Sequence, residues 1–487
     1  MNRTLILGLL LSLLAVAVLT LLSFSIEGAR TTYPHPAPPV IGEEPAIQQH
    51  ISQAEIEAGR FTLEELLEHG RTIFTAGFNS LDGAGRPELT GTGEPRKRRT
   101  APDNFNRISA PDANSCRGRH NLPAAGGGGD NVSNVFVLAQ ENLFVDFDGD
   151  PVENGSNRTL KTVGNERNTV SIFGASFIEL LAREMTAELQ AQRASACDQA
   201  MRAGWVVTAS LAAKRVDFGA LTCHPDGSAD TSHVEGVDAD LVIRPFHQKG
   251  VVVSLREFSN NALLHHHGIL AAERADGKAD PDADGYANEL TVGDITALTL
   301  FQATLPAPVR VAPNTRAERE AAARGRLNFD QIRCSDCHIP AMPLASLEIV
   351  EPGPFNPANN LRPEDVGATY KVDLSPFIAD LKQDGEGNFL LPVYTDLKRH
   401  DMGEFLNNEA LEQAGVPTRC WLTRKLWGIA SEPPYLHHGR ATLISEAILA
   451  HGGEAQEQRY AFAELEQREQ AELLKFLLTL RIAAGEN

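Results

Sequence analysis

The sequence predicts a mainly α-helical protein built from two related units, with long loops and a few short strands. Residues 171–196 and 461–482 carry apolar side chains at helical spacing, which predicts one long helix in each range. A G-R-x-x-F pattern occurs at 70–74 and again at 325–329, each time upstream of a Cys/His cluster, which indicates a repeated unit. The chain contains 40 glycines and 28 prolines, consistent with long loops. Residues 239–246 and 250–255 are expected to form short strands between the units.

Composition and charge exclude some classes of partner. The 487 residues are 42% hydrophobic and 22% charged, as in ordinary globular proteins long enough for two or three domains. The formal net charge of −20 argues against nucleic acid and against an anionic membrane surface. A basic protein, such as a small electron carrier, would be attracted to this chain.

The N-terminus indicates export. Residues 5–24 form an uncharged apolar run that is long enough to span a bilayer and long for a signal peptide. Residues 1–30 are therefore expected to be a signal peptide or a membrane anchor, and the Pro-rich residues 31–60 a linker. Both alternatives predict a periplasmic protein, either soluble after cleavage or tethered to the inner membrane by residues 5–24.

A C-x-x-C-H motif at Cys334, Cys337 and His338 predicts covalently attached haem c. Two thiolates one helical turn apart can add to the two vinyl groups, which leaves His338 as the proximal iron ligand. A zinc half-site would need a second Cys/His pair at metal spacing, which the motif lacks. The two units are therefore expected to be cytochrome c-like domains, covering 61–310 with insertions and 311–487.

The N-terminal cluster has a similar outline but lacks one cysteine. Cys116 and His120 have the outer spacing of the motif, Arg119 stands at the second cysteine position, and Pro123 follows as Pro340 follows the other cluster. The C-x-x-x-H spacing alone is a weak signal.

Four stretches carry further motifs: ANSCRGRHNLPAAGGGGDNV (113–132), CSDCHIPAMPL (334–344), YTDLKRHDMG (394–403) and LTRKLWGIASEPPYLHHGRATLISEAILAHGGEA (422–455). With them the chain resembles the di-haem oxidoreductase family (putative peroxidases), relatives of bacterial di-haem cytochrome c peroxidases and of the methylamine-utilisation di-haem enzyme. The resemblance implies two haems, with electrons entering at the C-terminal haem and peroxide reacting at the N-terminal one. The family has Cys at position 119 and Asp at position 438, where this chain has Arg119 and His438.

Residues 116–120 are interpreted as a degenerate haem site. His120 can still supply an axial imidazole, Cys116 can form one thioether, and the Arg119 guanidinium can pair with a haem propionate. The alternative is that no haem binds here and Cys116 is a free thiol. On the distal side of the C-terminal haem, Met402 is the predicted sixth ligand and His400 the alternative; a turn with a packed methionine is the other interpretation.

Residues 244–268 supply candidates for acid–base chemistry. Glu257, His265, His266 and His267 could move the peroxide proton during O–O cleavage. A core or surface histidine cluster explains the same residues, and the sequence does not choose among them.

Residues 280–291 begin like an EF-hand loop, with alternating carboxylates followed by a glycine. They predict a shortened calcium site; the alternative is a solvated acidic turn. The predicted ligands are Asp280, Asp282, Asp284, Asn288 and Glu289.

The remaining cysteines allow a Cys197–Cys223 disulfide in an oxidising compartment, with Cys420 unpaired. Trp427 is either an electron relay between haems or a core residue.

Two functions fit these observations. The first is a periplasmic haem oxidoreductase, peroxidase-like, that acts on peroxide or a small oxidisable substrate. Its electron carrier would be a protein of the cytochrome c or cupredoxin type. The second is a non-catalytic electron-transfer protein with a single working haem.

Overall fold

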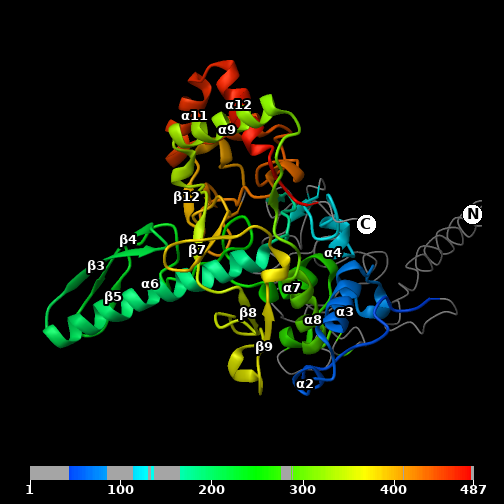
Figure 1. Ribbon diagram of the computed structural model, residues 1–487. Coiled ribbons are helices and arrows are strands. Elements are labelled where there is room, and N and C mark those ends of the chain that lie inside the picture. The colour runs from blue at the N-terminus through cyan, green and yellow to red at the C-terminus, as the bar shows by residue number, and fades with distance from the viewer. Residues whose placement is uncertain are drawn as a thin grey trace, which may run out of the picture.

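The computed structural model describes residues 43–84, 113–129, 133–135, 165–275, 287, 289–409 and 411–483. Helices dominate and the strands are short, as predicted (Figure 1). The cytochrome c-like character of two separate domains stays a prediction. Within the described ranges no helix is long and apolar enough to cross a membrane; the apolar run at 5–24 lies outside them.

The α-helices are α2 (Gln53–Glu57), α3 (Leu63–Thr75), α4 (Cys116–Arg119), α6 (Ala175–Ala203), α7 (Leu255–Ala262), α8 (Val292–Ala303), α9 (Arg316–Gln331), α10 (Ile444–Leu449), α11 (Gln456–Glu464) and α12 (Gln467–Leu477). A π-helical turn, η4 (Leu263–His267), continues α7. The 3₁₀ turns are η1 (Ser80–Asp82), η5 (Ala272–Arg274), η6 (Cys334–Asp336), η7 (Pro363–Asp365), η8 (Ser375–Phe377), η9 (Glu404–Leu406), η10 (Ile429–Ser431) and η11 (Gly453–Ala455).

The strands pair in small antiparallel sheets of two or three. The three-stranded sheets have the orders β3-β4-β5 and β10-β11-β7, and the pairs are β1-β2, β6-β14, β8-β9 and β12-β13. The strands are β1 (Ser133–Val135), β2 (Asn165–Arg167), β3 (Val207–Ala213), β4 (Val216–Cys223), β5 (Ala229–Asp230), β6 (Val309–Arg310), β7 (Met342–Leu344), β8 (Glu348–Glu351), β9 (Tyr370–Asp373), β10 (Lys382–Gln383), β11 (Phe389–Leu391), β12 (Arg399–Asp401), β13 (Cys420–Leu422) and β14 (Leu480–Arg481).

The G-R-x-x-F repeat marks two equivalent helix crossings. Gly70 lies where α3 packs on α8, and a Cβ there would come within 2.1 Å of the Ala297 carbonyl oxygen. Gly325 lies where α9 packs on α12, and a Cβ there would come within 1.8 Å of the Glu472 carbonyl oxygen. Only glycine permits such close approach of two helix backbones. One turn later, Phe74 and Phe329 are buried and line the same cavity.

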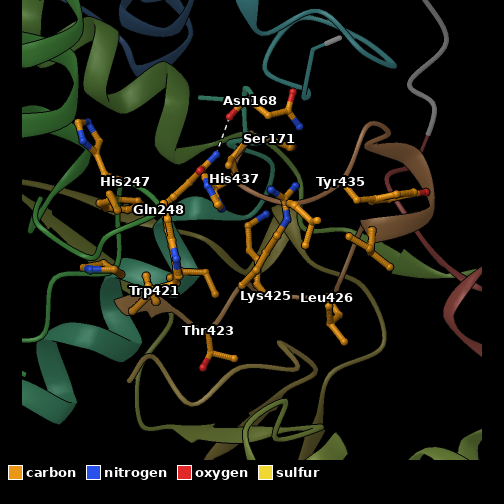
Figure 2. Close-up of a pocket in the computed structure, with 18 of the residues that line it drawn as sticks. Asn168, Ser171, His247, Gln248, Trp421, Thr423, Lys425, Leu426, Tyr435 and His437 are labelled. Carbon is orange, nitrogen blue, oxygen red and sulfur yellow. Dashed lines mark hydrogen bonds between the residues drawn. The ribbon is translucent and has the colours of Figure 1, made fainter. Parts of the chain in front are cut away.

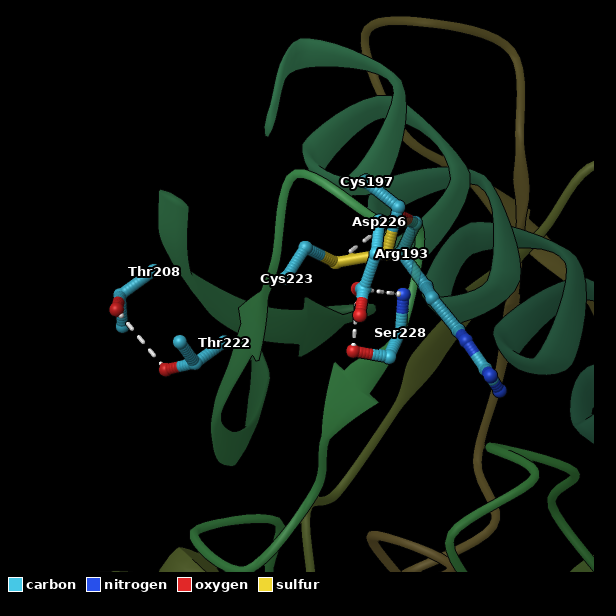
Figure 3. Close-up of a disulfide and its surroundings, with 7 residues drawn as sticks. All are labelled: Arg193, Cys197, Thr208, Thr222, Cys223, Asp226 and Ser228. Atoms are coloured by element: carbon cyan, nitrogen blue, oxygen red, sulfur yellow. Dashed lines mark hydrogen bonds between the residues drawn. A yellow bond between two sulfur atoms is a disulfide. The ribbon is translucent and has the colours of Figure 1, made fainter. Parts of the chain in front are cut away.

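An arm projects from the body, at the left of Figure 1. It consists of the outer half of α6 and the sheet β3-β4-β5 packed along it. The Cys197–Cys223 disulfide joins α6 to β4 (Figure 3). This confirms the pairing that the sequence allowed. The other four cysteines, all within the described ranges, form no disulfide.

Buried apolar residues form two main clusters. The larger extends from Ile47 through α3, α6 and α8 and includes residues 342–393 of the predicted C-terminal domain. The smaller joins α9 to α11, α12 and residues 426–448. The boundary expected at 310/311 therefore does not coincide with the boundary between the hydrophobic clusters, because the strands β7–β11 pack on the N-terminal one.

Two expectations about elements were wrong. The single helix at 461–482 is two helices, because Leu465 is extended (ψ 145°) and Glu466 begins α12 with a capping box to Glu469. Residues 239–246 and 250–255 contribute one isolated bridge, Phe246 to Val252, rather than strands. The strands of this region are β3 and β4, just before it.

Candidate functional site

One cavity of about 390 Å³ runs between the two Cys/His clusters. Its walls include Cys116 and His120 at one end and Cys334, Cys337 and His338 at the other. Figure 2 shows its middle part, where Asn168, Gln248, Trp421 and His437 are labelled. The lining is mainly apolar, as expected for a site that holds a large apolar cofactor.

The C-terminal cluster follows directly from α9. Ile332 ends the helix, Arg333 takes a left-handed conformation (φ 64°), and Cys334 begins η6. Burial, with the neighbouring Cys337, raises the pKa of the Cys334 thiol to about 12. Nδ1 of His338 lies 3.1 Å from the Tyr394 carbonyl oxygen. A carbonyl can only accept, so Nδ1 carries the proton and Nε2 keeps its lone pair.

His451 lies near His338 in the cavity lining, and it was not among the ligands predicted from the sequence. Its Nδ1 is 2.8 Å from the Ala447 carbonyl oxygen, which again leaves the Nε2 lone pair available. The ring centroids of His338 and His451 are 6.4 Å apart. Burial lowers the pKa of both rings, that of His338 to about 4 with a contribution from His451. Both are therefore neutral near pH 7, as metal binding requires.

This spacing matches two imidazoles on one metal ion. A metal–nitrogen bond is about 2 Å, and a ring nitrogen lies about 1 Å from its centroid, so two opposed rings have centroids about 6 Å apart. The signal for His451 was present in the sequence, because HGGEA was among the motifs that carried the resemblance.

His400 and Met402, the ligands predicted from sequence, occupy different environments. Both ring nitrogens of His400 contact carboxylates, Nε2 at 2.8 Å from Asp396 and Nδ1 at 2.7 Å from Glu454. Burial opposes protonation, but hydrogen bonds to Asp396 and Cys337 outweigh it and raise the pKa of His400 to about 11. His400 is thus an imidazolium without a free lone pair. Met402 lines the cavity.

The Cys337, Asp396 and His400 ligand atoms lie within 4.8 Å of one another. This group belongs to the wall of the same cavity, because Cys337 and His400 both line it. A thioether at Cys337 would remove its thiolate from any metal-binding role.

At the N-terminal cluster, α4 is a single turn that carries Cys116 and Arg119 on one face. His120 Nδ1 lies 3.2 Å from the Gly127 carbonyl oxygen, so Nε2 again keeps a lone pair. Burial, with the Arg119 charge, lowers the pKa of His120 to about 3. The glycine run 126–129 therefore supports the histidine through its backbone.

Arg119 is buried beside two further histidines. Its Nη1 lies 2.8 Å from Nδ1 of His266 and 3.3 Å from Nε2. Arginine only donates, so the shorter contact makes Nδ1 the acceptor and places the proton of a neutral ring on Nε2. Cys116 Sγ lies 3.6 Å from Nε2 of His267, whose Nδ1 is 2.9 Å from the Ala113 carbonyl oxygen. Burial raises the pKa of Cys116 to about 12.

The four acid–base candidates divide into two pairs. His266 and His267 line the cavity, whereas Glu257 and His265 are not among its lining residues. Glu257 Oε2 accepts a 2.7 Å bond from the Val253 amide at the start of α7, and burial raises its pKa. Because η4 is a π-helical turn, its three consecutive histidines point in different directions.

The cavity contains an aromatic stack that the sequence did not reveal. Trp421 and His437 are stacked with centroids 3.7 Å apart. Lys249 Nζ lies 3.5 Å from the Trp421 centroid and donates to the carbonyl oxygens of Pro417, Thr418 and Cys420 at 2.8–2.9 Å. Trp427, the predicted relay candidate, instead packs in the core, T-shaped on Phe177.

The calcium prediction rests largely on residues outside the described ranges, namely Asp280, Asp282, Asp284 and Asn288. Glu289 is described and buried, and its Oε2 accepts a 2.7 Å bond from the Leu270 amide. The loop stays a prediction.

Residues 374–480 match the sequence model of one family, described as "Di-haem oxidoreductase, putative peroxidase". The predicted resemblance is confirmed for this segment. It contains His400, Met402 and His451 and begins after the C-x-x-C-H motif. No curated protein matches the chain.

Two solved structures are similar at low identity. Hydrazine synthase of Kuenenia stuttgartiensis is 14% identical with a TM-score of 0.26, over 57% of this chain and 76% of its own. A MauG-like protein associated with microbial copper homeostasis is 13% identical with a TM-score of 0.27, over 52% and 77%. TM-scores of this size do not establish a shared fold.

Proposed function

We propose that the protein is a periplasmic c-type haem oxidoreductase, peroxidase-like, with a haem held at the C-terminal end of the cavity. The pair of neutral imidazoles of His338 and His451, with ring centroids 6.4 Å apart, carries this proposal. The residues fit the group, since the two thiols and the two neutral histidines surround one mainly apolar cavity. Cys334 and Cys337 would hold haem covalently, and His338 and His451 would bind its iron in place of Met402 or His400.

Bound haem supplies reversible one-electron chemistry and, where a coordination position is open, a site for peroxide. With both His338 and His451 binding its iron, a haem at the C-terminal end would serve electron transfer. At the other end of the cavity, His120 is also neutral and also donates from Nδ1 to a backbone carbonyl, as His338 and His451 do. His120 and Cys116 would hold a second haem by one thioether, and electrons would pass from the C-terminal end to this one.

The chain itself supplies a proton donor for the N-terminal end. Arg119 donates to Nδ1 of His266 at 2.8 Å, which keeps the ring proton on Nε2. We propose that His266 delivers this proton to a small substrate such as peroxide. His267, beside Cys116, would be the neighbouring group that accepts a proton. Arg119 is then a positioning residue rather than a propionate partner.

One observation favours the alternative function, a non-catalytic electron carrier with a single haem. Arg119 is buried and bonded to His266 within the cavity lining, where a second haem would need space. Haem stoichiometry separates the two functions.

The mass of the exported, purified protein tests the proposal. We expect one or two covalent haems, and Cys334→Ser or Cys337→Ser should impair attachment at the C-terminal site. Unmodified polypeptide alone, in the presence of a functioning maturation system, would exclude a c-type haem function. One haem supports the carrier and two support the oxidoreductase.

The iron ligand is tested by His451→Ala, with His400→Ala and Met402→Ala as matched controls. Loss of His451 should convert a low-spin signal to high spin in electron paramagnetic resonance, because one axial nitrogen is lost. The two controls should keep the low-spin signal. If Met402→Ala or His400→Ala gives the spin change and His451→Ala does not, the original ligand prediction is correct.

A further inference from the structure

His247 lines the cavity (Figure 2) but has no part in the function proposed above. It begins the turn 247–250, which is closed by the bridge between Phe246 and Val252. Its backbone is left-handed, with φ at 57°, a conformation that is strained for a residue other than glycine. Strain of this kind is concentrated at sites where a side chain must be held in one place. The contacts of the imidazole indicate what it is held for.

Two side chains from distant parts of the chain fix the hydrogen-bond polarity of His247. Arg167 Nη2 donates to Oε1 of Gln413 at 3.1 Å, and an arginine can only donate. The Gln413 amide is therefore oriented with its Nε2 towards His247, whose Nδ1 lies 3.1 Å away. Nδ1 must accept this bond, so the neutral ring carries its proton on Nε2.

This set of hydrogen bonds is buried, and its polarity cannot easily reverse. Arg167 is 8% exposed and Gln413 4%, and the Arg167 guanidinium also forms an ion pair with Glu409. Burial, with the positive charge of Arg167, lowers the pKa of His247 to about 3. The ring is therefore neutral near pH 7, where its Nε2–H serves as a hydrogen-bond donor rather than as an acid.

The donor lies at the N-terminal end of the cavity. The Phe258 ring contacts both His247, with centroids 5.4 Å apart, and His120, with centroids 6.2 Å apart. Among the described residues, none forms a hydrogen bond with Nε2 of His247, although the ring lines the cavity. A fixed donor without a protein partner, in a mainly apolar cavity, is suited to bind and orient a ligand.

We propose that His247 is a substrate-binding residue, whose Nε2–H donates a hydrogen bond to an oxygen lone pair of peroxide or of another small oxygen ligand. Gln413 and Arg167 are positioning residues, because they keep the proton on Nε2. This role rests on the function proposed above, since it needs the second haem beside His120. It separates two tasks at the N-terminal end: His266 delivers a proton, whereas His247 binds the ligand and keeps its own proton.

The chain allows the polarity to be reversed with almost no change of shape. In Gln413→Glu the new carboxylate can only accept, so Nδ1 of His247 should take the proton and Nε2 should lose it. His247→Phe removes the donor but keeps an aromatic ring. His437→Phe is the matched control, because His437 lines the same cavity but already donates from Nε2 to Asn408 Oδ1 at 2.7 Å.

The first experiment determines the tautomer of His247 by nitrogen-15 NMR of histidine-labelled protein. It uses the reduced protein with carbon monoxide, in which haem iron is diamagnetic, and the signals lost in His247→Phe assign the ring. We expect the proton on Nε2 in the wild-type protein and on Nδ1 in Gln413→Glu. A wild-type ring protonated on Nδ1, or a tautomer that Gln413→Glu leaves unchanged, would overturn the proposal.

The second experiment measures fluoride binding to the oxidised protein by absorbance, because iron-bound fluoride accepts hydrogen bonds from a neighbouring donor. The Kd for fluoride should rise about fivefold to tenfold in His247→Phe and in Gln413→Glu, as loss of one hydrogen bond predicts. It should stay within about twofold in His437→Phe. No rise in His247→Phe, or an equal rise in His437→Phe, would overturn the binding role and leave the haem function intact. If the wild-type protein binds no fluoride, the N-terminal haem site itself fails, and the role of His247 fails with it.

Discussion

At the residue scale, the hydrogen-bond partner of each histidine decides which ring nitrogen keeps its lone pair. His120, His338 and His451 each donate from Nδ1 to a backbone carbonyl, so that each keeps its lone pair on Nε2. His247 instead accepts from the Gln413 amide at Nδ1 (3.1 Å), which places its proton on Nε2. His400 contacts two carboxylates. His267 has the same Nδ1 bond, 2.9 Å from the Ala113 carbonyl oxygen, with its Nε2 3.6 Å from Cys116 Sγ. The Nδ1 bond therefore leaves Nε2 able to bind a metal but does not by itself single out the iron ligands.

Arg119 carries the first prediction at this scale. Arg119→Cys would complete a C-x-x-C-H motif, because Cys116 and position 119 share one face of α4. If the native site holds haem by one thioether, the haem count should stay the same and the pyridine haemochrome band should shift towards the two-thioether position. If the native site is empty, the variant should gain one haem in mass, and peroxidase activity should rise only then. If the native site already holds haem, peroxidase activity should fall, because His266 loses the Arg119 contact that positions its proton.

The neighbouring exposed Arg117 provides the control, since Arg117→Cys creates no such motif and should change neither mass nor band. If Arg119→Cys also changes neither, the cavity beside α4 does not accept porphyrin, and the single-haem carrier is the better description.

At the element scale, helix crossings and short irregular segments have separate roles. The crossings α3/α8 and α9/α12 place Phe74 and Phe329 at the cavity, whereas turns and loops supply Cys334, His338 and His451. The arm of α6 and β3–β5 takes no part in the cavity lining. A change that destabilises the arm should therefore leave the cavity and its histidines unaffected.

The disulfide tests this separation. Cys197 and Cys223 are 26 residues apart, and a loop of that size contributes about 3.5 kcal/mol in the chain-entropy model. Cys197→Ser with Cys223→Ser should lower the protection of arm amides in hydrogen exchange while haem content and spectrum stay unchanged. A loss of haem comparable to that of Cys334→Ser would contradict the independence of arm and cavity.

At the scale of the whole molecule, Asp294 ties three distant segments together. Its buried carboxylate contacts His50 Nδ1 at 2.6 Å, His69 Nε2 at 2.7 Å and the Ile51 amide at 3.1 Å. The hydrogen bond to Asp294 raises the pKa of His50 against the effect of burial. Burial opposes ionisation of Asp294, but the hydrogen bonds from His50 and His69 outweigh it and lower its pKa.

The direction of each pKa shift determines how the stability of the protein depends on pH. The contribution of His50 is fully present below pH 6.5, its ordinary pKa, and is lost as pH rises through the raised value. The contribution of Asp294 is present above 3.8 and is lost as pH falls through its lowered value. This cluster therefore stabilises the protein most between pH 3.8 and pH 6.5. The melting temperature should fall as the pH rises above that range.

Asp294→Asn should lower the free energy of unfolding by about 3 kcal/mol and flatten its pH dependence above pH 6.5. The exposed ion pair of Asp198 with Arg202 offers the control, because Asp198→Asn should cost less than about 1 kcal/mol. An unchanged alkaline slope in Asp294→Asn, measured by thermal unfolding across pH, would contradict the role of the cluster.

The sequence by itself determined the helical class, the repeated G-R-x-x-F unit, the C-x-x-C-H motif and the possible Cys197–Cys223 pair. These depend on local spacing, which a sequence displays directly. It did not determine His451 as the partner of His338, the Trp421–His437 stack or the attachment of β7–β11 to the N-terminal core. His451 and the strands β7–β11 meet partners more than 100 residues away in the chain. Trp421 and His437 are closer in sequence, but their stack depends on how the chain between them folds back. Only the packed backbone decides which carbonyl each imidazole meets, and therefore which lone pair faces the cavity.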